Sequence, residues 1–152
     1  MPSEFSGMER RLDELSERLA RLKPLQAKSR DDFSEDAYLR DIVERNLEVA
    51  AQCCIDLSHR IIAIEQAVKP RDYYEAILQM GELGVMPVPF ARQIAPIAGF
   101  RNILIHEYLS VDWDEVFDHL QHLDEIERFA GYVRDWLLQK LTSEEKPAHP
   151  EM

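Results

Sequence analysis

Apolar residues recur along this chain with the spacing of buried helix faces. The first stripe advances by three and four residues in turn, and it comprises Phe5, Met8, Leu12, Leu15, Leu19 and Leu22. Pro24 then interrupts or kinks the pattern, because proline cannot donate the backbone hydrogen bond that a helix interior needs. A seam with this spacing predicts a first helix that packs against a partner along its whole length.

A longer stripe follows a polar link from Ser29 to Ser34 and ends at Pro70. Its members are Leu39, Val43, Leu47, Ala50, Cys54, Leu57, Ile61, Ile64 and Val68. Thirty or so residues in a helix span ~45 Å. This second helix is therefore expected to be the spine of a bundle.

Capping and breaking residues divide the chain after Pro70. Asp72 with Glu75 resembles a capping box, and it predicts a short helix through Met80 that stops in the region of Gly81 and Gly84. The next segment is predicted to be rich in turns because it contains three prolines, which are Pro87, Pro89 and Pro96.

Asp112 with Glu115 predicts the cap of the last helix, and a final apolar stripe follows it. That stripe comprises Val116, Leu120, Leu123, Ala130, Val133, Leu137 and Leu141. Residues 142–152 lack a stripe and contain two prolines, so they are predicted to form a disordered tail. No strand pattern persists, and the chain is predicted to be an all-α protein: one domain over residues 1–141, an antiparallel up-and-down helical bundle with one broken element.

Composition agrees with a single domain that has a real core, since 45% of the 152 residues are hydrophobic. No stretch approaches ~20 uncharged apolar residues, and residues 1–11 lack an apolar signal segment, so we expect a cytoplasmic protein without a membrane span. Cys53 and Cys54 are adjacent, and a disulfide between neighbours on a helix would be strained. We interpret them as small core or interface residues.

The formal net charge of −11 argues against a nucleic-acid ligand, because phosphate binders usually carry an excess of basic residues. The acidity is unevenly spread, however. Residues 87–111 carry a net charge of +1, whereas residues 112–128 carry −6. This distribution is compatible with a short cleft that contacts phosphate, and the acidic remainder suits a basic protein partner.

The densest chemistry lies between residues 101 and 108, where Arg101, Asn102, His106 and Tyr108 interrupt an apolar helix. On a continuous helix each residue turns ~100°, so Asn102 and His106 share one face while Arg101 and Tyr108 share another. An arginine and a histidine on one helix suit acid–base chemistry at a phosphate group. The imidazole transfers protons to or from the reacting oxygens, and the guanidinium neutralises the charge that develops on phosphate.

The pattern Arg-Asn-x-x-x-His-x-Tyr resembles the signature of the HEPN superfamily, and within it the HepT-like toxins. Residues 42–47 and 55–57 resemble the family's long second helix, and Gly99 and Phe100 precede the motif as they do in most members. The resemblance covers roughly residues 8–140. It implies a HEPN-type helical bundle that forms a homodimer, in which two copies of the motif helix supply two His106 and two Arg101 side chains to one cleft.

The resemblance also implies a function. It identifies the chain as a toxin, a metal-independent endoribonuclease with Arg101 and His106 as catalytic residues, and Asn102 is expected to orient the His106 ring. In HepT-like toxins the tyrosine of this motif is adenylylated by a minimal nucleotidyltransferase antitoxin. Tyr108 would be that acceptor here, and the added phosphates would occlude the site beside Arg101.

Two other interpretations remain open, because a fold alone does not establish an activity. The chain could be a non-catalytic HEPN module that binds nucleotide or docks a nucleotidyltransferase, or a structural helical dimer. His119 and His122 have a spacing that suits a metal, but they lack a second cluster of ligands, so we interpret them as part of a solvated polar face. No metal and no cofactor is expected.

Overall fold

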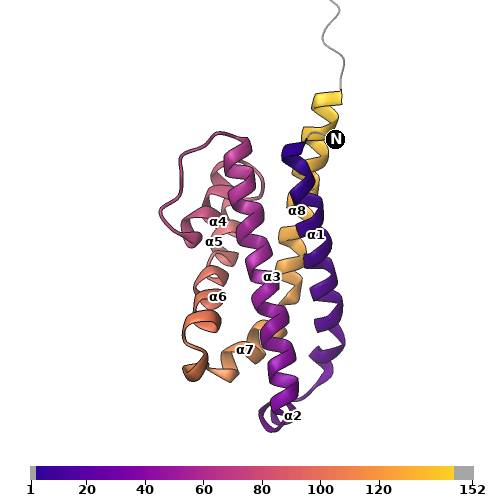
Figure 1. Ribbon diagram of the computed structural model, residues 1–152, viewed down its shortest axis with the longest axis vertical. Helices are drawn as coiled ribbons and strands as arrows, with labels where there is room; N and C mark the ends of the chain where they lie inside the picture. Colours follow the sequence, from indigo (N-terminus) through magenta and orange to yellow (C-terminus); the bar gives the residue numbers. More distant parts are fainter. Residues whose placement is uncertain (1–2, 146–152) are drawn as a thin grey trace, which may run out of the picture.

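Three long helices define the long axis of the molecule: α1 (Ser3–Leu22), α3 (Ala37–Ile64) and α8 (Leu123–Glu145), which lie side by side in Figure 1. The computed structural model describes residues 3–145, except the side chains of residues 3, 4, 108, 144 and 145. Every regular element in that range is helical. The predicted all-α class is therefore confirmed.

A fourth leg of the bundle is broken into short helices. These are α4 (Tyr73–Glu82), α5 (Val88–Ile94) and α6 (Ile97–His106), followed by the 3₁₀ turn η2 (Tyr108–Ser110). The chain runs down α1, up α3, down this broken leg and up α8 (Figure 1). The prediction of an antiparallel up-and-down bundle with one broken element is confirmed.

The first seam behaves as predicted. All six of its apolar side chains, from Phe5 to Leu22, are buried, and α1 packs along α3 and α8. Helix α1 ends at Leu22, and Pro24 lies in the first turn of the 3₁₀ helix η1 (Lys23–Ala27), where its missing N–H is tolerated.

The spine helix α3 is slightly shorter than predicted. It ends at Ile64, because Gln66 adopts a left-handed φ of 55°. The N–H groups of Gln66 and Ala67 turn back to the carbonyl oxygens of Ala63 and Ile62, at 3.1 and 3.0 Å, and close the last turn. Val68, which continued the apolar stripe in the sequence, is exposed in the following loop.

Two segments that the sequence presented as links contain short helices. Helix α2 (Arg30–Glu35) begins with a capping box between Ser29 and Asp32, and it buries Phe33 beside Trp113 and Phe117. Helix α5 begins directly after Pro87, and Pro89 lies in its first turn, where proline is compatible with a helix. The proline-rich approach to the motif is thus partly helical.

The predicted last helix is two helices, α7 (Trp113–Leu120) and α8. Asp112 caps α7 by accepting from the N–H groups of Asp114 and Glu115. Gln121 and His122 interrupt the helix, yet Val116, Leu120 and Leu123 all stay buried. Residues 142–145, assigned to a tail from the sequence, extend α8, whereas the rest of that tail, residues 146–152, lies outside the described residues.

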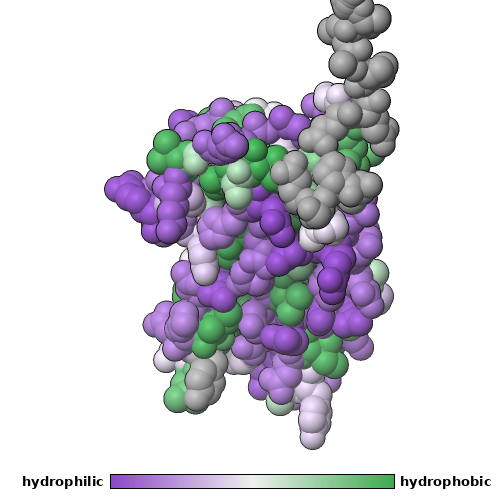
Figure 2. Space-filling model, turned by 45° about the horizontal axis from the view of Figure 1, so that its top comes forward, coloured by the Kyte–Doolittle hydropathy of each residue, from purple (hydrophilic) through white to green (hydrophobic). Residues whose placement is uncertain are grey.

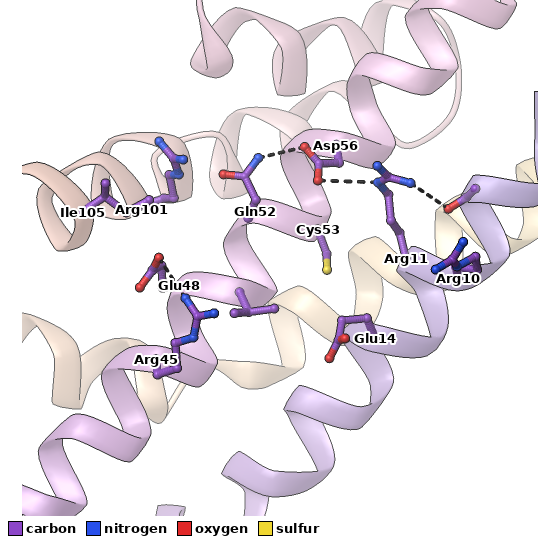
Figure 3. A pocket seen from close by; sticks show the side chains of 12 residues that line it. Arg10, Arg11, Glu14, Arg45, Glu48, Gln52, Cys53, Asp56, Arg101 and Ile105 are labelled. Atoms are coloured by element: carbon purple, nitrogen blue, oxygen red, sulfur yellow. Dashed lines mark hydrogen bonds and ion pairs between the residues drawn. The ribbon is translucent and has the colours of Figure 1, made fainter.

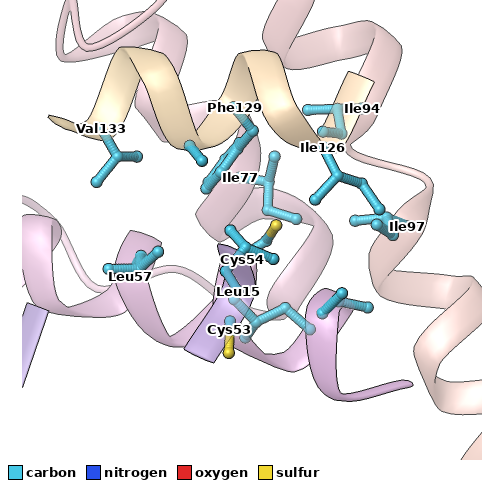
Figure 4. Close-up of a cluster of buried hydrophobic side chains, with 14 of the residues drawn as sticks. Leu15, Cys53, Cys54, Leu57, Ile77, Ile94, Ile97, Ile126, Phe129 and Val133 are labelled. Carbon is cyan, nitrogen blue, oxygen red and sulfur yellow. The ribbon is translucent and has the colours of Figure 1, made fainter. Parts of the chain in front are cut away.

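The core forms where α3, α4 and α8 meet. Figure 4 shows Cys54 of α3 close to Ile77 of α4 and Phe129 of α8, all of them buried. Both cysteines are free thiols. Burial raises the pKa of Cys53 to about 11 and also raises the pKa of Cys54, which agrees with their interpretation as core residues.

The face in Figure 2 is mostly hydrophilic, with separate hydrophobic groups rather than one broad patch. None of the helices in residues 3–145 has the length and apolar content that crossing a membrane requires.

Candidate functional site

Helix α6 carries the motif on its outer side. Its buried residues, Ile97, Ala98, Phe100 and Leu104, pack it against the rest of the bundle, where it contacts α3 and α4. Asn102 and His106 are exposed, and Arg101 is half-buried at the edge of the buried face. Burial of one apolar face thus directs the polar motif outward.

The helix ends at His106, and this corrects the expectation of a continuous helix through Tyr108. Glu107 has φ −126° and ψ 37°, outside the helical region, and its N–H makes the last helical bond, 2.9 Å from the Ile103 oxygen. Tyr108 then opens the 3₁₀ turn η2. The spacing of seven residues therefore does not set the direction of Tyr108, whose side chain lies outside the described part of the structure.

Arg101 is held by two neighbours. Its Nη1 donates to Asn102 Oδ1 at 3.0 Å, and its Cζ lies 5.5 Å from the centroid of the Tyr73 ring, in the range of a cation–π contact. Its Nε is buried and has no hydrogen-bond partner among the described residues. The Asn102 amide therefore contacts Arg101, whereas the sequence had predicted that it would contact the His106 ring.

His106 occupies the exposed C-terminal end of α6. The structure does not bring its ring to Asn102, and it does not line the cavity beside Arg101 described next. Arg101 and His106 thus share one short helix but face different surroundings within a single chain.

A cavity of about 590 Å³, which we call the arginine cavity, opens between α1, α3 and α6. Figure 3 shows its walls. Helix α6 contributes Arg101 and Ile105, α1 contributes Arg10, Arg11 and Glu14 with Gly7, and α3 contributes Arg45, Glu48, Val49, Gln52, Cys53 and Asp56.

The charges in the arginine cavity are partly paired. Arg11 lies 3.5 Å from Asp56, and Arg45 lies 3.4 Å from Glu48. Arg10 and Arg101 make no ion pair among the described side chains. Sequence reasoning missed this cavity, because its residues belong to three segments that only folding brings together.

The two histidines with metal-like spacing have structural roles. His119 stacks on Phe100 with ring centroids 3.8 Å apart, and burial lowers its pKa. His122 Nδ1 lies 2.7 Å from the Asp118 carbonyl oxygen. The described residues contain no cluster of three or more groups that suits a metal ion. The interpretation of His119 as solvated was wrong, because the ring packs against the motif helix.

Comparison with known proteins shows which family this chain is similar to. The family model described as ribonuclease HepT-like matches residues 13–133. The chain is 30% identical over 139 residues to the tRNA nuclease HepT of Aphanizomenon flos-aquae, covering 91% of this chain and 93% of the relative. It is 26% identical over 103 residues to the mRNA nuclease HepT of Shewanella oneidensis, covering 67% and 77%.

Solved structures agree on the fold. The tri-AMPylated HEPN toxin of Shewanella oneidensis, solved in complex with its MNT antitoxin, superposes with a TM-score of 0.76 at 21% identity, over 89% of this chain and 99% of that one. The family model and the two nuclease relatives define the class as ribonucleases of the HepT-like type. The chain belongs to the ribonuclease HepT-like family.

Proposed function

We propose that the protein is the toxin of a toxin–antitoxin pair and acts as a metal-independent RNA endonuclease with Arg101 and His106 in its active site. The observation that carries the proposal is the arrangement of α6. In this chain, which a ribonuclease family model matches, α6 carries a guanidinium without an ion-pair partner among the described residues, at a cavity, and an exposed imidazole at its end.

The chemistry follows from these two groups. The His106 imidazole removes the proton from a ribose 2′-hydroxyl, and O2′ attacks the adjacent phosphorus. The bond between phosphorus and O5′ breaks, and the leaving oxygen takes a proton. Arg101 donates to the phosphate oxygens as negative charge accumulates on them. The products are a 2′,3′-cyclic phosphate and a 5′-hydroxyl, and no step needs a metal.

One histidine cannot easily remove one proton and deliver the other in a single step. A two-fold dimer with α6 at its interface supplies a second His106 and a second Arg101 to the same cleft. Leu109, which is 87% exposed directly after the motif, is a large apolar side chain suited to such an interface. We therefore propose a homodimer through the motif region.

The partner we propose is a minimal nucleotidyltransferase antitoxin that adenylylates Tyr108. The Shewanella oneidensis structure is of a tri-AMPylated toxin with its MNT antitoxin, and this chain has a tyrosine two residues after His106. AMP groups on Tyr108 would bring phosphate charge near Arg101 and compete with the substrate phosphate.

The decisive experiment measures RNA cleavage by purified variants. His106→Ala and Arg101→Ala should each lose about 10²-fold or more in rate while their circular dichroism stays helical. Matched controls are His122→Ala and Arg92→Ala, which change the same residue types outside the site. Wild-type cleavage should persist in a chelator. RNA binding without cleavage by the wild-type protein would instead support a non-catalytic module.

Adenylylation of Tyr108 is tested separately, by measuring the intact mass of the protein. Incubation with the antitoxin, ATP and Mg²⁺ should raise the intact mass by whole AMP units, and Tyr108→Phe should abolish that increase because it removes only the acceptor oxygen. An adenylylated Tyr108→Phe protein would move the acceptor to another residue, and Tyr38, Tyr73, Tyr74 and Tyr132 would be tested next.

A further inference from the structure

Gln52 presents a fixed hydrogen-bond acceptor in the arginine cavity. It lies on α3, and its Nε2 donates to Asp56 Oδ1 at 2.7 Å. A carboxylate only accepts hydrogen bonds, so the amide nitrogen must face Asp56 and the carbonyl oxygen must face away from it. Asp56 is itself anchored by Arg11 at 3.5 Å. The orientation of the Gln52 amide is therefore determined by its neighbours.

The Gln52 oxygen points to the side of the cavity where Arg101 lies (Figure 3). It is buried and has no hydrogen-bond partner among the described residues, as is also true of Arg101 Nε. Buried polar atoms are nearly always paired, so two unpaired atoms on one cavity call for a ligand. That ligand must offer a donor to Gln52 and an acceptor to Arg101.

A ribonucleotide offers both groups at short range. Its phosphate oxygens accept from a guanidinium, and its ribose carries a 2′-hydroxyl that donates a hydrogen bond. A deoxyribonucleotide offers the phosphate alone. The surrounding charge agrees with a phosphate ligand, because four arginines line the cavity against three carboxylates, and Arg10 on α1 makes no ion pair among the described side chains.

We propose that the arginine cavity binds the nucleotide adjacent to the scissile phosphate, and that Gln52 Oε1 accepts a hydrogen bond from its ribose 2′-hydroxyl. The inference rests on the proposed RNA cleavage and extends it to the recognition of ribose. Because His106 does not line this cavity, the hydroxyl that Gln52 contacts belongs to a neighbouring nucleotide and is not the nucleophile. Gln52 is thus a specificity residue, and Asp56 is a positioning residue.

The test measures binding without cleavage. In the His106→Ala background, a short fluorescein-labelled single-stranded RNA and a 2′-deoxy strand of the same sequence are titrated by fluorescence anisotropy. RNA should bind about fivefold more tightly than DNA, the contribution of one hydrogen bond. Adding Gln52→Leu should bring that ratio close to one and leave DNA affinity unchanged.

Gln93→Leu is the matched control. It makes the same chemical change on α5, where Gln93 donates to Glu125 at the surface, and it should leave the ratio intact. Asp56→Asn is the second variant: an asparagine can face either end of the Gln52 amide, so the oxygen is no longer fixed and the ratio should fall partway.

Three outcomes would overturn the proposal. The first is an equal loss of RNA and DNA affinity in Gln52→Leu, which would mean that Gln52 acts only by holding Arg101. The second is that Gln52→Leu changes neither affinity. The third is that neither strand binds. Failure of the proposed function is seen in a different assay. A wild-type protein that does not cleave RNA would contradict the proposed function, and it could still bind RNA more tightly than DNA in this test.

Discussion

The neighbours of Arg101 contact the planar shape of its guanidinium group as well as its charge. Asn102 accepts from one edge at 3.0 Å and the Tyr73 ring lies against the group. Lysine preserves the charge but lacks the planar fork. We expect Arg101→Lys to lower the single-turnover cleavage rate by about 10²-fold, close to the effect of Arg101→Ala.

Asn102→Ala should lose less, about tenfold or under, because it removes one hydrogen bond that holds Arg101 and no group that transfers a proton. A lysine variant that cleaves at the parental rate would show that position 101 contributes charge alone.

His119 should make the fold sensitive to acid. Burial lowers its pKa in the folded state, so the unfolded chain binds the proton more readily. The contribution of the neutral ring is therefore complete above the unfolded pKa, ~6.5, and is lost as the pH falls through the lowered folded value.

We expect His119→Phe to preserve the stack on Phe100 and to reduce the loss of stability between about pH 7.5 and pH 5. Urea unfolding of both proteins at the two pH values measures this difference, and His122→Phe is the control. An identical acid loss in wild type and His119→Phe would assign the sensitivity to the carboxylates.

At the level of the elements, α4 and α5 pack closely against each other at Gly81. A Cβ there would lie 3.0 Å from Val88 Cα and 3.2 Å from the Ala91 Cβ, so the backbone of α5 would have to move. We expect Gly81→Ala to destabilise the fold by ~1–3 kcal/mol, although alanine favours helix.

Gly131→Ala is the opposite case. Gly131 lies inside α8, and a Cβ at this position would have no neighbour within 4 Å, so the substitution should be neutral or stabilise by up to ~1 kcal/mol. Thermal unfolding of the two variants compares them directly, and equal melting temperatures would contradict the close packing of α4 on α5.

The long helices were predictable because each buries one continuous stripe. The short helices were not, since α2 and α5 are stabilised by caps and by contacts such as Phe33 with Trp113, which spacing in the chain does not reveal. The split between α7 and α8 was not predicted because Leu120 and Leu123 keep a helical spacing across it. In the candidate site, the sequence motif proposed Arg101 and His106, whereas Gln52 could be considered only once the folded arrangement was known.

For the whole molecule, Leu109 and Val68 provide a matched test of the dimer. They are 87% and 83% exposed, and the segments that hold them, after α6 and after α3, lie toward opposite ends of the bundle (Figure 1). We expect Leu109→Asp to convert a dimer into a monomer by light scattering and to abolish cleavage, because charge at an apolar interface is costly. Val68→Asp should do neither. A wild-type protein that is monomeric at micromolar concentration would contradict the composite active site.

The acidity of the chain is less available to partners than its net charge of −11 suggests. Within the acidic segment, Asp114 and Asp118 both pair with Arg30, at 2.7 and 2.9 Å, and tie α7 to α2. Part of the segment that the sequence offered to a basic partner therefore stabilises the fold.

Helix α3 touches α1, α2, α4, α6, α7 and α8, so each of those helices covers some of its surface. Solvent can reach the amides at its centre only when several neighbours separate together. In native-state hydrogen exchange we expect the amides around Leu57 to exchange last, at the rate set by global unfolding, whereas amides of η2 exchange through local opening. The motif helix α6 thus joins a slowly exchanging spine to a segment that we expect to open without unfolding the rest of the protein.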